Sequence, residues 1–561
     1  MPTSNQAPPK VHTRGEVIRA ATENYLNSLN MTNLPTPEVI QENILTDVET
    51  ALDIENTLRG KGKKYKIPHE LAPAQIAMAL EKTCPIVKIS SGMTKDSDYD
   101  ILGIYQDSGP DEGIYATDLT IFNNLIRRYN FEISTKNIEE TLRILSDTVP
   151  RVTACRDRNL IAVNNGIYDY EAKQLLPFTP DKVFLSKSKV DYNPKAVNPV
   201  IIEPDGSLWD VESWMAEIAD DPEVTNLLWS ITGAIIRPNN PWGRAAWFFA
   251  TTGNNGKGTL CELYRQICGE GTYTSIPLAD MGKDFALEPL VGASAIIVDE
   301  NDVGTFIDKA ANFKALVTND VVQINRKFKM AIAYRFQGFM VQCCNEFPRC
   351  KDKSDSLFRR LLIVPFTKSF TGCEKKYIKN DYLHRKDVLE YVLRRVLELM
   401  PNYYELPEPE ACKAALDDYR QYNNPVLAFL DEVLSELVWD LVPWSFLYDL
   451  YKAWFKRTNP SGSIQGRTTF IQEVQAAIPN YPDTGYIALA SQDKRRHKNM
   501  MVEPEYLIHD YDLTDWMNPA YAGGSLPNID AQCRFPIYLQ ADKYSGLLRV
   551  TPKVAPSDPN E

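Results

Sequence analysis

One short stretch of the sequence has the residues of a phosphate-binding loop. ATTGNNGKGTL (250–260) contains the Gly-Lys pair of the pattern G-x-x-x-x-G-K-[ST], between an apolar run and a helical pattern. Backbone N–H groups in such a turn can wrap phosphates, the dipole of the following helix reinforces them, and the lysine adds a point charge. A glycine-containing surface turn is the alternative. The candidate nucleotide-binding residues are Gly253, Asn254, Asn255, Gly256, Lys257, Gly258 and Thr259.

Two residues of this loop depart from the pattern. Thr251 stands where the first glycine is expected, and Gly258 stands where a hydroxyl residue should follow the lysine. Because Gly258 has no side chain, Thr259 is the only nearby hydroxyl that could reach Mg²⁺, directly or through a water. We therefore assign a metal-binding role to Thr259.

A second apolar run ends in two carboxylates. In ASAIIVDEND (293–302), four apolar residues lead into Asp299 and Glu300, and Asp299 follows Lys257 by 42 residues with a helical pattern between them. A buried strand with this ending can deliver one acid to Mg²⁺ and use the other to polarise an attacking water. We expect Asp299 to bind the metal and Glu300 to act on water; a strand that ends at the surface is the alternative. The second acid favours hydrolysis.

A third apolar run ends at Asn345, and the arginine pair Arg359-Arg360 comes before a fourth. A polar side chain at the tip of a strand beside the acid-bearing strand can sense the γ-phosphate and orient water. An arginine supplied by a neighbouring subunit neutralises charge in the transition state, which is worth ~10³–10⁵ in rate. We expect Asn345 and one of the two arginines to be catalytic. Surface salt bridges are the alternative for both arginines.

These residues need a sheet to hold them. From Trp242 to about Phe366 strands, loops and helices alternate, which is typical of a parallel sheet flanked by helices. Upstream, 100–118 predicts two short strands around a turn, Asn165-Gly166 predicts a tight turn, and 224–236 predicts an apolar helix that stops before Pro238. The fold class is therefore α/β.

Basic residues concentrate between 311 and 370, where eleven Lys and Arg face four Asp and Glu, a local net charge of +7. Within this island, Arg326, Lys327 and Lys329 lie between two strand-like runs, and cations on a rigid hairpin suit the gripping of a nucleic-acid backbone. A solvated edge is the alternative.

The C-terminal part has a pattern of three helices and a basic segment. The helices are expected in 426–437, 444–457 and 467–478, followed by QDKRRHKNM. This order favours a winged helix, with 467–478 as the recognition helix; a helical protein-docking domain is the alternative. The expected DNA contacts of the wing are Lys494, Arg495, Arg496 and Lys498, beside His497.

Composition and charge argue against several classes of protein. A net charge of −13 argues against a protein that coats nucleic acid without specificity, and ten cysteines without a C-x-x-C pair argue against a disulfide framework or a structural zinc site. No apolar run approaches the ~18 residues of a membrane span, and the N-terminus lacks the apolar core of a secretion signal. We expect a cytoplasmic protein of a bacterial host cell.

Four motifs in order carry a resemblance to a known family. GNNGKGT, IIVDEND, FKALVTNDVVQINRKFK and VQCCNEFPRCKDKSDSLFRRLLIVPF resemble the superfamily 3 helicases of the phage/plasmid primase–helicase family, and the chain is similar to replication initiator-helicases of staphylococcal genomic islands from about 100 to 520. The resemblance implies a hexameric AAA+ ring that binds ATP and Mg²⁺ between subunits, moves on single-stranded DNA and unwinds forked DNA, with a separate primase or other replication proteins as partners. Lys257 matches the loop lysine, Asp299 and Glu300 the strand acids, Asn345 the sensor, and Arg359 or Arg360 the finger.

The same resemblance suggests a division into domains. We expect a mostly helical N-terminal region (1–95), a mixed α/β domain before the motor (96–240), the AAA+ domain (241–375), a helical linker (376–423), the winged helix (424–520), and an extension with a tail (521–561).

Three other functions remain alternatives. A primase–helicase would also polymerise nucleotides, although the acids of KDSDYD (95–100) lack the surroundings of a priming site and favour a polar loop. A small-molecule kinase could use the Gly-Lys-Gly-Thr order, which adenylate-kinase-type loops share, but it would need no basic hairpin. An origin-binding initiator without a motor would bind DNA and need no Lys257.

Overall fold

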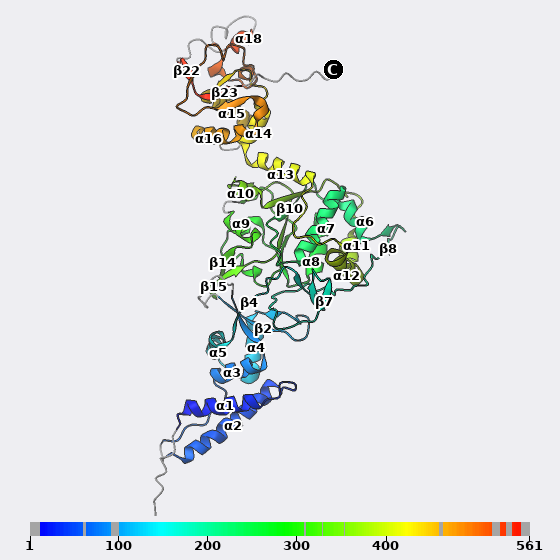
Figure 1. Ribbon diagram of the computed structural model, residues 1–561, viewed down its shortest axis with the longest axis vertical. Coiled ribbons are helices and arrows are strands. Elements are labelled where there is room, and N and C mark those ends of the chain that lie inside the picture. Colours follow the sequence, from blue (N-terminus) through cyan, green and yellow to red (C-terminus); the bar gives the residue numbers. More distant parts are fainter. Residues whose placement is uncertain are drawn as a thin grey trace, which may run out of the picture. The chain divides into compact units, whose positions relative to one another are not determined.

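The computed structural model describes residues 12–59, 63–90, 100–307, 310–327, 329–352, 354–458, 464–518, 528–534 and 541–550 (Figure 1). The chain forms two compact units, Met1–Lys413 (unit 1) and Ala414–Glu561 (unit 2). All ten cysteines are free, as their spacing predicts. Among the described residues, no helix is long and apolar enough to cross a membrane.

Unit 1 begins with helices that pack on a small sheet. The helices are α1 (Arg14–Ser28), α2 (Pro37–Thr57), α3 (Pro73–Thr83), α4 (Leu119–Tyr129) and α5 (Thr135–Thr148). The sheet has the order β3-β2-β1-β4, made by β1 (Ile86–Ser90), β2 (Ile101–Tyr105), β3 (Tyr115–Ala116) and β4 (Arg151–Thr153). Helices and strands share one apolar core. The boundary expected after residue 95 falls between β1 and β2, which pair with each other, and the two strands expected in 100–118 are confirmed.

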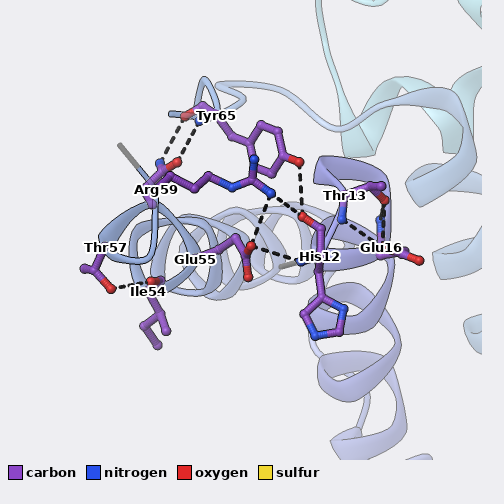
Figure 2. A network of polar contacts seen from close by, with 9 residues as sticks. His12, Thr13, Glu16, Ile54, Glu55, Thr57, Arg59 and Tyr65 are labelled. Atoms are coloured by element: carbon purple, nitrogen blue, oxygen red, sulfur yellow. Dashed lines mark hydrogen bonds and ion pairs between the residues drawn. The ribbon is translucent and has the colours of Figure 1, made fainter. Parts of the chain in front are cut away.

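A polar network fixes the start of α1 to the end of α2 (Figure 2). Thr13 and Glu16 form a reciprocal capping box, which satisfies two N–H groups that a helix start leaves open. The backbone carbonyl of His12 accepts hydrogen bonds from the Arg59 guanidinium and from the Tyr65 hydroxyl, and the Arg59 guanidinium lies 3.8 Å from the centre of the Tyr65 ring. The side chain of Arg59, the first residue of the basic segment 59–66, is thus bound within unit 1.

Two hairpin regions follow. β5 (Leu160–Val163), β6 (Gly166–Asp169) and β7 (Gln174–Leu176) form an antiparallel sheet, and the tight turn predicted at Asn165-Gly166 is confirmed. Gly166 is required there because a Cβ atom would lie 2.5 Å from the carbonyl oxygen of Leu176. β8 (Ile201–Ile202) and β9 (Leu208–Trp209) form a second, short hairpin.

A five-stranded parallel sheet forms the centre of unit 1. Its order is β11-β12-β16-β10-β18, made by β10 (Ala245–Phe249), β11 (Tyr273–Thr274), β12 (Ala295–Val298), β16 (Phe339–Cys344) and β18 (Leu361–Pro365). Its three central strands, β10, β12 and β16, are almost wholly buried and read as continuous apolar runs, as parallel strands covered on both faces do. The parallel sheet with flanking helices is confirmed.

Helices cover both faces of this sheet. α7 (Pro222–Ile236) and α8 (Lys257–Cys268) share a core with Ala246 and Phe248 of β10. Trp247, whose side chain points the other way, packs against Phe313 of α9 (Ala311–Val317). α6 (Val211–Ala219) packs beside α7. The helix predicted over 224–236 is thus part of the helical layer that holds α8.

Most of the segment expected as a helical linker (376–423) belongs to unit 1, which ends at Lys413, and the rest belongs to unit 2. α11 (Lys376–Asn380), α12 (Lys386–Arg394) and the π-helical turn Arg395–Leu399 are helical as predicted, and α11 and α12 pack against α8. The reason is the apolar face of α12 and the following turn, where Val388, Val392 and Val396 are fully buried.

A basic hairpin stands beside the sheet. β14 (Val321–Arg326) pairs antiparallel with β15 (Lys329–Arg335), and Ile324 and Ile332 form the buried side of the pair. The hairpin expected from the sequence around 323–330 is therefore present.

Unit 2 contains the three helices that the sequence predicts: α14 (Pro425–Val433), α15 (Trp444–Thr458) and α16 (Arg467–Ala477). They pack on a sheet with the order β19-β23-β20, made by β19 (Leu441–Pro443), β20 (Tyr486–Ala488) and β23 (Gly546–Arg549). The central strand β23 comes from the stretch expected as an extension and tail. It joins the sheet because its buried Leu547 completes the apolar core.

Unit 2 also contains a buried carboxyl group, that of Glu505. Its Oε2 accepts hydrogen bonds from the backbone N–H groups of Val438 (2.8 Å) and Trp439 (3.1 Å). Burial nevertheless raises the pKa of Glu505 to about 7. Since the pKa is about 4.3 in an unfolded chain, the folded state keeps a proton that the unfolded state loses. This contribution to stability is complete below about pH 4 and is lost as the pH rises through 7.

We predict that wild-type unit 2 loses roughly 3 kcal/mol more stability between pH 4.5 and 7.5 than Glu505→Gln does, because glutamine keeps an acceptor and cannot ionise. The measurement is urea unfolding of the full chain at several pH values, followed by hydrogen exchange of peptides from 437–447. The exposed neighbour changed in Glu503→Gln is the control and should behave as wild type. Equal pH slopes for Glu505→Gln and wild type would contradict the assignment.

Candidate nucleotide-binding site

The predicted loop connects β10 to α8 at the carboxyl end of the sheet. Asn254 and Gly256 have φ values of +53° and +86°, in the left-handed region, so the chain turns sharply just before Lys257 starts the helix. α8 has no side-chain cap. Among the described residues, the N–H groups of Gly258 and Thr259 have no acceptor. Open N–H groups at the positive end of a helix are the donors that a phosphate group needs.

Lys257 and Asn345 meet in this site. Lys257 is 4% exposed, and its Nζ donates a hydrogen bond to Asn345 Oδ1 at 2.9 Å. Asn345 directly follows β16, which pairs with β10, so the parallel register brings together two residues that are 88 positions apart. Burial lowers the pKa of the Lys257 ammonium. A buried cation with one neutral partner is suited to receive an anionic ligand.

The two acids follow β12, next to β16 in the sheet. Both Asp299 and Glu300 are exposed, and Glu300 is close enough to raise the pKa of Lys257, against the larger effect of burial. Asp299 already has a cationic partner, because its Oδ2 lies 3.0 Å from an Nη2 of Arg265 on α8. Arg265 was not among the residues predicted from the sequence. Nothing in its position along the helix that follows the loop indicates a contact with Asp299.

Asn301 is a second residue of this site that was not predicted from the sequence. It is buried, donates to Gln342 Oε1 and to the carbonyl of Cys343, both at 3.0 Å, and accepts from the N–H of Leu278. These bonds fix the chain directly after the two acids to β16. The available signal was an amide residue directly after the Asp-Glu pair, whose burial the sequence does not show.

A cavity of about 560 Å³ opens beside the loop. The loop is tied to one of its walls, because Asn254 donates to Glu374 at 2.9 Å and accepts from the N–H of Phe370 at 2.7 Å. The lining combines apolar side chains, acids and lysines. Its members outside the loop include Trp214, Ile218, Phe370, Lys375, Lys376 and Lys379. In the sequence, the run CEKKYIKN (373–380) shows only a cluster of lysines, and nothing in it indicates that the segment folds back to the loop.

These residues fit a nucleoside triphosphate. Open N–H groups, the buried ammonium of Lys257 and the lysines Lys376 and Lys379 suit the phosphates, whereas Lys375 is already paired with Glu203. The apolar part of the cavity suits a base. No cluster of three or more His, Cys, Asp or Glu side chains that could hold a metal ion alone occurs in the described part of the chain. A hydroxyl from Thr259 and a carboxylate from Asp299 suit Mg²⁺, which takes few protein ligands when it is bound with phosphates.

The arginine pair lies away from this site within the same chain. The carbonyl of Arg360 accepts from the N–H of Ala245, at the amino end of β10, whereas the loop follows the carboxyl end. At about 3.3 Å per residue, five strand residues separate the two by roughly 16 Å. Arg360 is half-buried and donates to Ser356, whereas Arg359 is exposed and has no side-chain partner among the described residues.

Some of the candidate DNA-binding residues belong to unit 1 and the others to unit 2. On the hairpin of unit 1, Arg326 ends β14, burial lowers its pKa, and Lys327 lies in the turn. Lys329 begins β15, and its side chain lies outside the described residues.

In unit 2 the predicted wing residues Lys494, Arg495, Arg496 and Lys498 are exposed. β21 (Arg495–Arg496) pairs with β22 (Lys543–Tyr544), which adds Lys543 to the cluster. Arg496 lies 3.6 Å from Asp542, a solvent-exposed ion pair.

The structure thus defines a mixed α/β protein whose parallel sheet carries a candidate nucleotide site. A family of unknown function (DUF5906) matches residues 248–360, which hold the loop, the two acids and the basic hairpin. A model described as D5 N terminal like matches 115–220, and one described as poxvirus D5 protein-like matches 421–518.

Individual relatives are distant. A protein described as "Putative helicase L207/L206", from Acanthamoeba polyphaga mimivirus, is 22% identical over 218 residues. The match covers 38% of this chain and 22% of that protein's length. Two apo structures of the NrS-1 C-terminal region, each 14% identical, have TM-scores of 0.36 and 0.39 and cover 73% and 79% of this chain, and 86% and 92% of their own. The two D5-like models and the helicase relative are thus what parts of this chain are similar to.

The Arg265–Asp299 pair gives a prediction. We expect Arg265→Gln to lower, several-fold, the Mg²⁺ concentration needed for half-maximal nucleotide binding, because it removes a cation that competes for Asp299. A Mg²⁺ titration with a fluorescent ATP analogue measures this, and Arg265→Lys, which keeps the charge, should stay near wild type. A higher Mg²⁺ requirement in Arg265→Gln would mean instead that Arg265 holds Asp299 in place for the metal.

Proposed function

We propose that the chain is an ATP-dependent DNA helicase that acts in replication. The observation that carries this proposal is the meeting of Lys257, Asn345 and the Asp299-Glu300 pair at the carboxyl edge of one parallel sheet. The similarity of parts of the chain to the two D5-like models and to the helicase relative supports DNA as the partner. That the protein serves a phage or another mobile element stays a prediction.

Each residue of the edge has a task in hydrolysis. Lys257 and the N–H groups of Gly258 and Thr259 bind the phosphates, and Glu300 accepts a proton from the attacking water. Asn345, at the end of β16, accepts the hydrogen bond of Lys257 and acts as the sensor of the γ-phosphate. Bound Mg²⁺, held by Thr259 and Asp299, would supply neutralisation of phosphate charge.

The site needs a second copy of the chain. Neither arginine of the pair can reach Lys257 within one chain, so we infer a ring in which a neighbour supplies the finger, with a hexamer as the expected form. Arg359 is the better candidate, since it is exposed while Arg360 is engaged by Ser356. The strand order, with β16 between the loop strand and the acid strand, supports an AAA+ arrangement.

DNA would contact both basic surfaces. The β14–β15 hairpin, with Arg326, Lys327 and Lys329, suits a grip on a single strand inside the ring. Unit 2, with its three helices and its β19-β23-β20 sheet, supports a winged helix in which α16 and the cluster at 494–498 contact duplex DNA. A small-molecule kinase would need neither surface. Of the acidic segment 95–100 considered for priming, only Asp100 lies within the described residues, where it pairs with Arg151.

We predict that Lys257→Ala and Glu300→Gln each abolish unwinding while DNA affinity stays within about twofold. Lys257→Ala removes the charge that holds the phosphates, and Glu300→Gln removes the general base, which is worth ~10²–10⁴ in rate. A forked-duplex unwinding assay and fluorescence anisotropy with labelled DNA measure the two properties. A variant that still unwinds the fork would refute the mechanism, and lost DNA binding would favour a misfolded protein.

A mixing experiment tests the finger. Arg359→Ala alone should lose ~10³-fold or more in ATPase rate. When it is mixed with Lys257→Ala subunits, activity should return in part, because some interfaces then pair an intact loop with an intact arginine. Arg360→Ala, mixed in the same way, is the control and should show no such rescue. If ATPase activity returned only in mixtures with Arg360→Ala, the finger would be Arg360 and not Arg359. If it returned with neither variant, a neighbouring subunit would not supply the arginine.

A further inference from the structure

The β8–β9 hairpin exposes an apolar face. Its outward side chains are Val200 (62% exposed), Ile202 (73%) and Leu208 (69%), with Val197 (72%) just before the hairpin. Ile202 and Leu208 are paired across the two strands. A two-stranded hairpin usually turns polar side chains to water, so four exposed apolar residues in one place mark a contact surface. In Figure 1, β8 lies at the outer margin of the ribbon of unit 1.

The inner side of the same hairpin is firmly held. Ile201 and Trp209 are buried, and the Trp209 ring packs on the rings of Trp214 and Tyr382 at centroid distances of 6.3 Å and 5.1 Å. The hairpin is therefore a fixed projection whose outer face is available to a partner.

The contacts that hold the hairpin in place extend to residues of the candidate nucleotide site. Glu203 is buried and accepts from Lys375 Nζ at 2.5 Å and from the Tyr377 hydroxyl at 3.2 Å. Lys375 and Trp214 both line the cavity beside the phosphate loop. The apolar face thus projects from the rim of a site that, under the proposed function, a second copy of the chain completes.

We propose that the outer face of the β8–β9 hairpin docks on a second copy of this chain and couples nucleotide binding to assembly. The proposal rests on the proposed function, because the neighbour that brings its arginine to the site must approach this rim. A closed ring buries such a one-sided patch against a different surface of the next subunit. An apolar contact without charged members in its centre suits a protein surface and does not suit DNA.

The test compares Ile202→Asp and Leu208→Asp with Ile54→Asp, a matched control on α2 where the isoleucine is 63% exposed. Mass photometry with a non-hydrolysable ATP analogue and single-stranded DNA measures assembly, and a fluorescent ATP analogue measures binding to single copies. We expect wild type and the control to assemble, and the hairpin variants to need at least tenfold more protein while nucleotide affinity stays within about threefold.

Assembly of the hairpin variants at the wild-type concentration would overturn this inference and leave the proposed function standing, as would an equal loss in the control. A wild-type chain that never assembles would overturn both. A photo-crosslinking amino acid at position 202 guards against misfolding. With nucleotide, it should give covalent products between two copies, and crosslinks only within one chain or to DNA would contradict the proposal.

Discussion

The candidate site depends on the register of three parallel strands. β10, β16 and β12 end at the same edge, so the loop lysine, the asparagine and the two acids meet although they lie far apart in the chain. The contact between Lys257 and Asn345 joins two of these strand ends and gives a buried ammonium its hydrogen bond. A buried ammonium without a hydrogen-bond partner would destabilise the folded state. Lys257 therefore stays bonded to Asn345, and the loop stays joined to β16, until an anionic ligand replaces this bond.

Several surrounding features serve this one edge. Asn301 fixes the chain after the acids to β16, and Arg265 holds Asp299 from α8. Asn254 ties the loop to the segment that contributes the lysines of the cavity. A ligand that displaces the loop would therefore also displace α8, β16 and the wall of the cavity. Such a connection is what the proposed function needs if hydrolysis is to move the β14–β15 hairpin.

The sequence predicts those parts of the site that depend on local pattern. The strand, loop and helix around Lys257 follow one another directly, and Asn345 and the acids are found because each follows an apolar run. Arg265 could not be predicted, because its contact with Asp299 depends on how α8 lies over β12. Lys375 and Lys379 could not either, since their segment folds back to the loop from more than a hundred residues away. In unit 2 the helices were predictable, whereas β23 joins two short strands from distant parts of the chain.

Because the arginine pair lies at the opposite end of β10 from the loop, we propose that the site is complete only between two copies of the chain. Electron microscopy of the purified protein with a non-hydrolysable ATP analogue and forked DNA tests this claim most directly. We expect a ring with nucleotide between Lys257 of one subunit and Arg359 of the next, and DNA in the channel. A chain that remains a single copy under these conditions, with nucleotide bound or not, would contradict it.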